Sequence, residues 1–586
     1  MLGTSQSPLR ALRSLLSANN INYYLVLTQD AHDSEYVADA DKRREFLTGF
    51  SGSAGQAIVG ATTAELATDG RYFLQASQEL SDPWTLRKLG TAGVVGWMDA
   101  LATAANKEHA VIGVDPRLIS AAMAKDLQEK LTKGSLVPIK ENLVDAIWQN
   151  KPHEPDAPIF ALDNTGESSA SKLDKVRADL IKENAHGIVI SALDEVAWLF
   201  NLRGNDIAYN PVFKSYALIT ATSATLYVDE KKMPAIPGIT TAPYDQIWDD
   251  LAAASEPIWA PEGSSWAIEA AIKTIATRKM SCVKVFKSVK NHTEIEGANR
   301  AQLKCALSIV RLMSWLDKTI DHQKVSEYNA AEKLLEFREQ LDDFRGNSFP
   351  TISSVGGNAA IIHYGPPVDS KHMVTRNEIF LLDSGCQFLH GTTDTTRTVH
   401  FGTPTDEERE AYTLVLKGHI SLAELVFPDG TNGTQLDAFA RQHLWKYGLD
   451  YRHGTGHGVG SYLNVHEGPI GFGSAPWAKS PLKPGNLISN EPGYYEDGKF
   501  GIRIESLVVV KEVPTKYKFG DKQYYGLETI TVVPFALNLI DIKLLTDGEL
   551  EWINNYSRHV RATLTPHLGD EEIAWLTANT EQLSRN

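Results

Sequence analysis

The first half of the chain contains an internal repeat, which limits the folds that this part can adopt. Residues 61–69 read Ala-Thr-Thr-Ala-Glu-Leu-Ala-Thr-Asp and align with residues 221–229, Ala-Thr-Ser-Ala-Thr-Leu-Tyr-Val-Asp. Upstream of these segments, Leu-Thr-Gly-Phe at 47–50 matches Leu-Phe-Asn-Leu at 199–202. Internal self-similarity indicates repeated structural units. We therefore expect two domains of common ancestry.

Both copies have the sequence pattern of an α/β domain. Apolar runs of strand length occur at 23–27 and 56–59 in the first copy and at 187–190 and 216–219 in the second. Stretches with helical character, such as 171–184, alternate with these runs. Alternating strands and helices are typical of α/β architecture.

Two changes along the sequence divide the chain into three parts. The proline-rich segment 151–158 is typical of a linker and places the first boundary near residue 156. Beyond Lys290, apolar side chains recur with a helical period over 294–317, which marks the start of a third domain. The expected domains are 1–156, 157–288 and 289–586. This division suits a chain of 586 residues, because single domains usually hold roughly 100–150.

The composition argues against several classes of function. The formal net charge is −16, whereas a nucleic-acid-binding surface needs clustered lysine and arginine. No apolar run approaches the roughly 20 residues that span a bilayer, so we expect no membrane segment. The three cysteines, Cys282, Cys305 and Cys386, are odd in number and lack metal-ligand spacing, which favours a reducing compartment. Since the opening residues show no apolar leader, we expect a cytoplasmic protein.

The third domain is expected to bring two aspartates together. A second helix is predicted from its cap at Ser326 to Phe344, followed by short strands. One of these strands is the apolar run 379–382, which ends at Asp383, and the next begins around Asp394. The eleven-residue separation is enough for a strand, a turn and a returning strand. The two carboxylates can therefore share a cation.

Further candidate ligands follow in glycine-rich segments. His453 and His457 lie in His-Gly-Thr-Gly-His, His466 precedes a glutamate, Glu491 lies in Asn-Glu-Pro-Gly, and Glu505 ends Gly-Ile-Arg-Ile-Glu. Carboxylates and imidazole suit Mn²⁺, Co²⁺ or Zn²⁺, and carboxylates can bridge two such ions. Two aspartates, two glutamates and one histidine are enough for a dinuclear site.

Each segment alone has a simpler structural explanation. An aspartate at a strand end is usually a turn or cap residue, and Glu-Pro-Gly is usually a turn. The glycine run is not a dinucleotide fingerprint, because Val459 stands where a third glycine is needed, and no phosphate-binding loop occurs. Only the combination of these segments supports a metal site.

In combination, these segments resemble the pita-bread metallopeptidases, the family of methionine aminopeptidase, prolidase and aminopeptidase P. The likeness is to the three-domain cytosolic Xaa-Pro aminopeptidases in particular, and it covers nearly the whole chain. In the first two domains it rests on the segments 32–36, 52–55, 69–73, 201–204 and 210–213. The resemblance implies two creatinase-like α/β domains followed by a pita-bread catalytic domain.

The resemblance also implies a role for each candidate ligand. Asp383 would bind one metal ion, Asp394 and Glu505 would bridge two, and His457 and Glu491 would bind the second. The cofactors are expected to be two divalent ions, with Mn²⁺ preferred. A water molecule bridging these ions would reach the hydroxide form near neutral pH and attack the peptide. Glu491, in preference to Glu505, is the expected proton acceptor.

Further side chains are implied as substrate contacts. Three histidines would hydrogen-bond the scissile carbonyl and pass a proton to the leaving nitrogen, namely His363, His453 and His466. The candidates for a pocket around a proline ring are Tyr364, Val465 and Tyr494. Arg503 is expected to orient the neighbouring carboxylates through a bidentate pair.

The implied activity is removal of the N-terminal residue from peptides with proline in second position, Xaa-Pro-Yaa. The expected partners are this peptide and a second copy of the chain in a homodimer, without nucleic acid or membrane. A prolidase-type dipeptidase is one alternative, although prolidases usually have one N-terminal domain. Creatinase, or a non-catalytic pita-bread scaffold protein, is expected to have lost metal ligands, whereas all five are present here.

Overall fold

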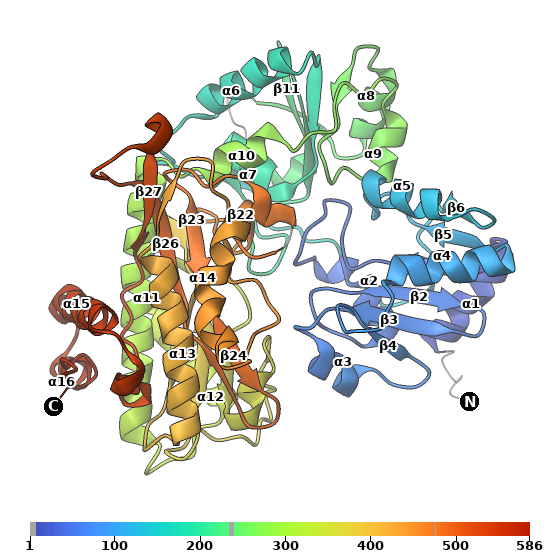
Figure 1. The fold of residues 1–586 in the computed structure, drawn as a ribbon. Helices are drawn as coiled ribbons and strands as arrows, with labels where there is room; N and C mark the ends of the chain where they lie inside the picture. Colours follow the sequence, from blue (N-terminus) through green and yellow to red (C-terminus); the bar gives the residue numbers. More distant parts are fainter. Residues whose placement is uncertain (1–6, 234–238, 475, 586) are drawn as a thin grey trace. The chain divides into compact units, whose positions relative to one another are not determined.

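The computed structural model describes residues 7–233, 239–474 and 476–585 (Figure 1). The chain folds into two compact units. The first unit ends at Lys284 and the second begins at Val285, except that Asn164–Gly166 belongs to the second unit. The boundary predicted at residue 288 lies close to this change of unit, whereas the one predicted at residue 156 falls inside the first unit. The division into three domains stays a prediction.

The described part of the first unit contains two large sheets and the two-stranded pair of β7 (Phe160–Ala161) and β9 (Leu202–Arg203). The first sheet has the strand order β4-β3-β2-β1-β5-β6, and the second has the order β12-β11-β10-β8-β13. The strands of the first sheet are β1 (Tyr23–Val26), β2 (Gln56–Gly60), β3 (Ala64–Thr68), β4 (Thr85–Lys88), β5 (Val111–Val114) and β6 (Ser135–Pro138). Those of the second are β8 (Gly187–Ile190), β10 (Ser215–Thr220), β11 (Ala224–Val228), β12 (Thr240–Pro243) and β13 (Ile258–Trp259). All four predicted apolar runs form strands.

The two sheets share a core topology, which confirms the internal repeat. In the first sheet, β1 pairs antiparallel with β2 and parallel with β5. In the second sheet, β8 pairs in the same way with β10 and β13. The segments that align in sequence form the equivalent strands β3 and β11, and each of these pairs antiparallel with the strand before it and parallel with the next strand.

A short helix follows the first strand of each sheet and ends in the same backbone turn. Gly49 follows α2 (Arg43–Thr48) with φ 76°, and Asn201 follows α7 (Leu193–Phe200) with φ 53°. Glycine and asparagine are the residues that most readily adopt this left-handed conformation at a helix end. The sequence alignment pairs these two residues, so the copies share this turn as well as their strand order.

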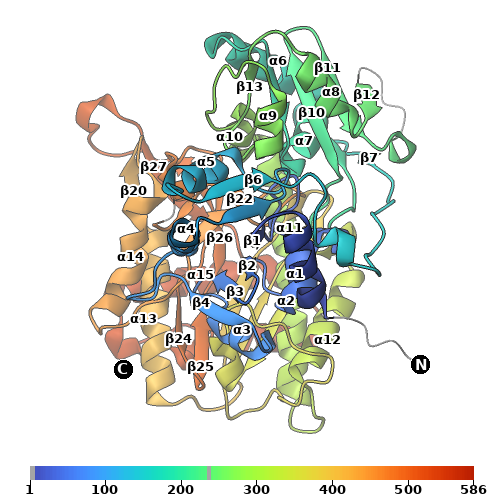
Figure 2. The ribbon, with the colours of Figure 1, turned by 90° about the vertical axis from the view of Figure 1, so that its right-hand side faces the viewer.

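Helices cover both faces of the first sheet. Side chains alternate along β1, so Tyr24 and Val26 pack in one core cluster with α1 (Pro8–Ala18). Leu25 points to the other face and packs in a cluster with α4 (Trp97–Glu108). In Figure 2, α1 and α4 lie on opposite sides of β1 and β2. This sheet is therefore the middle layer of an α/β arrangement.

The predicted helices are present, with changed ends. The helix predicted at 171–184 is α6 (Ser169–Lys182), and the one predicted at 294–317 is α11 (His292–Thr319). Ser326 caps α12 (Glu327–Glu339), because its hydroxyl accepts a hydrogen bond from the backbone N–H of Asn329 at 3.1 Å. This helix ends at Glu339 and does not reach Phe344, since Asp343 adopts φ 64° and Phe344 begins β14.

The second unit combines helices with several small sheets. Its largest sheet has the order β20-β27-β26-β23-β21-β22, and smaller groups are β14-β17-β18, β15-β16-β19 and β24-β25. The strands are β14 (Phe344–Asn347), β15 (Ile352–Val355), β16 (Phe380–Ser384), β17 (Cys386–Phe388), β18 (Gly391–Thr392), β19 (Thr395–Val399), β20 (Val426–Pro428), β21 (Gly456–Gly458), β22 (Glu467–Phe472), β23 (Leu487–Asn490), β24 (Gly493–Glu496), β25 (Phe500–Arg503), β26 (Ser506–Glu512) and β27 (Tyr524–Thr529).

The core of the second unit lies between its helices and strands. The helices are α11, α12, α13 (Asp406–Ala423), α14 (Gly433–Trp445), α15 (Asp547–Leu564) and α16 (Asp570–Ala578). One large apolar cluster joins residues of α11, α12, α13 and α15 to residues of β16 and β25. Packing against these helices therefore holds β16 and β25 in place. Within the described parts of the chain, no helix has both the length and the apolar character needed to cross a bilayer.

Candidate active site

Two strands of the second unit bring the candidate aspartates together, as predicted. Asp383 lies in β16 opposite Thr396 of β19, and Asp394 immediately precedes β19. The intervening residues form the short antiparallel pair β17 and β18. Asp383 and Asp394 are only 8% and 4% exposed, so this hairpin directs both carboxylates into the interior.

Glu505 joins the two aspartates from the segment between β25 and β26. Its N–H donates to the carbonyl of Thr396 at 3.1 Å, and the Thr396 hydroxyl donates to Glu505 Oε2 at 2.8 Å. One ligand oxygen of each of Asp383, Asp394 and Glu505 lies within 4.8 Å of the others. Burial, reinforced by neighbouring carboxylates, raises the pKa of Asp383 to about 6 and that of Glu505 well above its ordinary value. Bound cations would offset the mutual repulsion of these carboxylates.

His457 and Glu491 complete the cluster from β21 and the end of β23. His457 Nε2 lies 3.3 Å from Glu491 Oε1 and 3.4 Å from Asp394 Oδ2. The other ring nitrogen, Nδ1, lies 2.9 Å from the carbonyl oxygen of Gly458, a contact that orients Nε2 toward the carboxylates. Burial alone would lower the pKa of His457, but the hydrogen bond with Asp394 and the negative charge of Glu491 outweigh it and raise this pKa to about 9.

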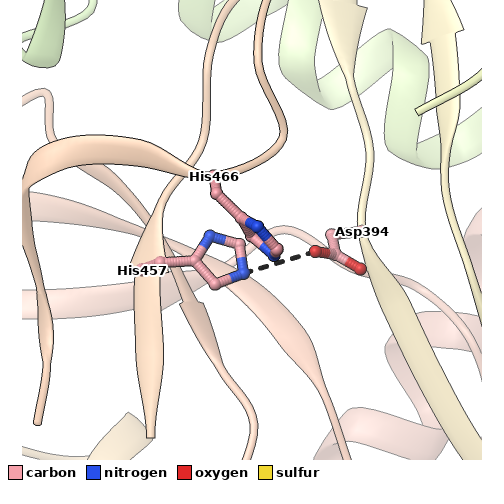
Figure 3. Close-up of side chains that lie close together, drawn as sticks. All are labelled: Asp394, His457 and His466. Carbon is pink, nitrogen blue, oxygen red and sulfur yellow. Dashed lines mark ion pairs between the residues drawn. The ribbon is translucent and has the colours of Figure 1, made fainter. Parts of the chain in front are cut away.

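His466 also lies within reach of this cluster. Ligand atoms of Asp394, His457 and His466 lie within 4.8 Å of one another, and the two imidazole rings are 4.3 Å apart between centroids. Figure 3 shows both rings beside Asp394, with His457 on a strand and His466 on the adjoining loop before β22. The geometry therefore suits either a substrate contact, as predicted, or a metal contact.

The donor set fits divalent cations. Asp383 Oδ1 and Glu505 Oε1 are buried and have no hydrogen-bond partner in the part of the chain that the structure describes. A buried carboxylate oxygen without a donor is unfavourable, and a cation would supply the missing partner. Each of the five predicted ligands belongs to at least one of three overlapping groups of potential ligands.

Arg503 links this cluster to His453 through Tyr495. Its Nη2 donates to Asp383 Oδ2 at 2.6 Å, and its Nη1 donates to the Tyr495 hydroxyl at 2.7 Å. The predicted contact with a carboxylate is present, but it is not bidentate, because the other nitrogens serve Tyr495 and Thr396. The Tyr495 hydroxyl in turn lies 2.8 Å from His453 Nε2. Tyr495 was missed, since a tyrosine after Glu-Pro-Gly gives no sequence signal of this contact.

The remaining predicted residues lie outside the three ligand groups identified in the described chain. His363 is half-buried in the turn after the 3₁₀ segment η4 (Gly356–Ala360), and the preceding carbonyl of Ile362 accepts a hydrogen bond from Arg503 Nη2 at 3.4 Å. Val465 is 0% exposed, so it offers no accessible surface to a proline ring. The Tyr494 hydroxyl donates to Glu496.

Matches to protein families cover most of the chain. Residues 296–512 match metallopeptidase family M24, and residues 523–583 match the C-terminal region of peptidase M24. Residues 8–147 and residues 150–294 each match the creatinase/prolidase N-terminal domain. Both copies of the internal repeat thus match a domain of the same description.

Similar proteins extend over the full length of the chain. A probable Xaa-Pro aminopeptidase P of Fusarium vanettenii is 48% identical over 98% of this chain and 99% of its own length. A probable Xaa-Pro aminopeptidase P of Podospora anserina is 47% identical over 98% of this chain and 89% of its own length. The crystal structure of X-prolyl aminopeptidase from Caenorhabditis elegans, described as a cytosolic enzyme with a di-nuclear active site, superposes with a TM-score of 0.94 at 34% identity, covering 99% and 100%. The expected fold, two creatinase-like domains followed by a pita-bread catalytic domain, is confirmed.

Proposed function

The chain belongs to metallopeptidase family M24, and from this membership we propose that it is an Xaa-Pro aminopeptidase. It hydrolyses the first peptide bond of substrates that read Xaa-Pro-Yaa and releases the N-terminal residue. The observation that carries the proposal is the assembly of all five predicted ligands into overlapping groups. A creatinase or a scaffold protein without metal has no need of such a cluster.

The five carboxylate and imidazole side chains would hold two divalent cations. These cations would polarise the scissile carbonyl and lower the pKa of a water molecule into the neutral range. The ligands are Asp383, Asp394, His457, Glu491 and Glu505. Asp394, Glu505 and His457 each belong to two of the three groups. Of these, only the two carboxylates can bridge two ions through their two oxygens, which supports a bridging role for Asp394 and Glu505. The carboxylate-rich donor set favours Mn²⁺.

Glu491 is the proton acceptor in this proposal. The Ser489 hydroxyl donates to Glu491 Oε1 at 3.0 Å and so orients the carboxylate. Burial raises the pKa of Glu491 above its ordinary value. A general base must lie within reach of the proton that it accepts, and Glu491, as a proposed ligand of the second cation, would lie beside the attacking water.

The three histidines contact the substrate in different ways. His466 lies closest to the metal ligands and is suited to stabilise charge that develops on the scissile carbonyl. Both ring nitrogens of His453 already have partners, since Nδ1 lies 2.7 Å from the carbonyl oxygen of Gly454 and Nε2 lies 2.8 Å from the Tyr495 hydroxyl. His453 would therefore exchange one of these contacts for substrate. His363 approaches from the segment after η4.

The amino-terminal specificity follows from charge and from the shape of proline. The proline nitrogen has no N–H to donate, so the enzyme must recognise the ring by its shape. The cationic amino terminus of the peptide is attracted to the buried carboxylate cluster. These two constraints restrict cleavage to the bond before a penultimate proline.

The cellular compartment and the oligomeric state are also part of this proposal. We place the enzyme in the cytoplasm, supported by its similarity to a protein described as cytosolic and by three cysteines that are all free thiols. We propose a homodimer, supported by exposed aromatic residues on and after α14, namely Phe439, Trp445 and Tyr447. Burial of such side chains is a common driving force for association.

Peptide hydrolysis tests the proposed function directly. The purified protein is incubated with Arg-Pro-Pro, Arg-Ala-Ala and the dipeptide Gly-Pro, with chelator and with added Mn²⁺. Of the three peptides, we expect only Arg-Pro-Pro to be cleaved, with release of arginine. Chelator should abolish this activity, and added Mn²⁺ should restore it. Faster cleavage of Gly-Pro would indicate a prolidase-type dipeptidase, and equal rates on Arg-Pro-Pro and Arg-Ala-Ala would contradict proline specificity.

A further inference from the structure

Glu327 is a fully buried carboxylate at the start of α12, outside the metal cluster. Its side chain is 0% exposed. Oε1 accepts hydrogen bonds from the backbone N–H of Val355 at 2.8 Å and from Asn358 Nδ2 at 3.0 Å. Oε2 accepts from the hydroxyls of Tyr364 at 2.8 Å and Ser370 at 2.9 Å. Both carboxylate oxygens are thus fully engaged.

These donors all belong to one segment of the chain, residues 355–370. This segment contains η4 and the turn that carries His363. Asn358 lies before His363 and Tyr364 directly after it, and Asn358 Nδ2 also contacts the Tyr364 hydroxyl at 3.1 Å. The carboxylate therefore fixes the chain on both sides of His363.

The surroundings of Glu327 supply hydrogen-bond donors to its carboxylate. The four donors are one backbone N–H, one side-chain amide and two hydroxyls, all of them neutral. Each donates to a lone pair of a carboxylate oxygen. Glu327 is also the first residue of α12, where the positive end of the helix dipole stabilises negative charge. A buried carboxyl group is tolerated when hydrogen bonds of this kind replace those to water.

We propose that Glu327 is a positioning residue that sets the place of His363 in the active site. Its carboxylate holds the 355–370 segment in one conformation, and His363 can then contact the peptide without an ordering cost. This inference rests on the proposed function, because it concerns a substrate contact of that reaction. A loose segment would present His363 in many orientations, and rate falls steeply when a reacting geometry is imprecise.

The backbone groups of Glu327 have hydrogen-bond partners of their own, so the side chain can be changed while residue 327 stays anchored. Its N–H donates to the carbonyl of His372 at 3.1 Å, and its carbonyl accepts from the Ser353 hydroxyl at 2.7 Å. Because these contacts use only backbone atoms of residue 327, they should persist in a Glu327→Gln variant. Its amide offers only one acceptor oxygen, so the four donors cannot all be satisfied.

Steady-state kinetics on Arg-Pro-Pro provide the first readout. In Glu327→Gln we expect kcat to fall by about tenfold or more with a KM change below about threefold, since the contact of His363 matters most as charge develops. In a His363→Ala background the same substitution should change kcat by less than about twofold, because the residue it positions is gone. The matched control is Glu332→Gln, which makes the same change at an exposed position of α12 and should leave both constants unchanged.

Amide hydrogen exchange provides a second readout that is independent of activity. Glu327→Gln should increase exchange over residues 355–370, with bound metal unchanged, and Tyr364→Phe should give a smaller increase because it removes one donor. The proposal would be overturned if Glu327→Gln lowered kcat by the same factor in the wild-type and His363→Ala backgrounds. Unchanged amide exchange over residues 355–370 would also overturn it. If the wild-type protein does not cleave Xaa-Pro peptides, the proposed function fails, and exchange alone then decides whether Glu327 holds the segment.

Discussion

The guanidinium of Arg503 donates to one oxygen of Asp383 at 2.6 Å, while the other oxygen of Asp383 has no hydrogen-bond partner in the described chain. The two oxygens of this carboxylate therefore have different roles. The Arg503 guanidinium holds one oxygen, and the other would be available to a metal ion. Arg503 would thus fix the orientation of this proposed metal ligand without competing for the oxygen that binds the ion.

Replacing Arg503 by lysine should test this orientation. Lysine has one nitrogen and cannot serve Asp383 and Tyr495 with the planar fork that arginine provides, so we expect kcat on Arg-Pro-Pro to fall by about tenfold or more. Arg311→Lys is the control, because Arg311 contacts Glu572 only loosely, at 3.6 Å near the surface. Full activity of Arg503→Lys would show that simultaneous contact with Asp383 and Tyr495 is not needed.

Loss of either proposed bridging carboxylate should abolish turnover. Asp394→Ala and Glu505→Ala each remove a ligand that belongs to two of the three groups. Since two-metal stabilisation supplies several kcal/mol, we expect rates at least about a thousandfold lower, together with less bound Mn²⁺. Metal analysis and peptide cleavage measure the two effects. Full activity in either folded variant would contradict the two-metal proposal.

Metal binding should compete with protons at His457. In the metal-free protein its pKa is raised to about 9, so the imidazole is protonated at neutral pH and must lose this proton to bind a cation. Mn²⁺ affinity should therefore increase with pH, by about tenfold per unit for one displaced proton, and level off near pH 9. Calorimetric titrations in buffers of different ionisation enthalpy measure the proton release. An affinity that does not change with pH would rule out this competition.

His466→Ala should lower kcat far more than it raises KM. The proposed hydrogen bond to the carbonyl strengthens only as charge develops, so its loss affects the transition state more than the bound substrate. We expect a decrease in kcat of about a hundredfold, typical of a lost donor to developing charge. If bound metal falls in parallel, His466 acts as a ligand, which its position beside Asp394 also allows.

Trp445→Glu should disrupt the proposed homodimer. Trp445 is 48% exposed at the end of α14, and a charge there disfavours burial in an interface. Light scattering should give twice the chain mass for the wild-type protein and about 64.5 kDa for the variant. Tyr517→Glu is the control, because Tyr517 is 74% exposed in the loop between β26 and β27. A wild-type mass of one chain at micromolar concentration would exclude the dimer.

The sequence predicted those features that depend on local pattern or on residue chemistry. The strand runs, the repeat and the Ser326 cap are such local features. The closeness of Asp383 and Asp394 was predictable because a hairpin is the simplest connection over that separation.

Features that depend on distant packing were not predictable. Glu327 follows a serine cap, which is usual for an exposed helix start, and its burial arises only because residues 355–370 fold over it. The contact of Tyr495 with Arg503 joins facing strands β24 and β25, and its link to His453 adds a third segment. Proximity in sequence to His466 suggested Val465 for a pocket, but neighbouring residues need not point to the same side.

The proposed metal ligands are spread from Asp383 to Glu505, on segments that meet only in the folded chain. An unfolded chain cannot gather them, so cations bind the native state and shift the folding equilibrium toward it. A free ion concentration one hundred times the dissociation constant adds about 2.7 kcal/mol to the free energy of unfolding. The supply of metal would therefore set not only the rate of this enzyme but also its lifetime, because a metal-starved chain opens more often to proteolysis.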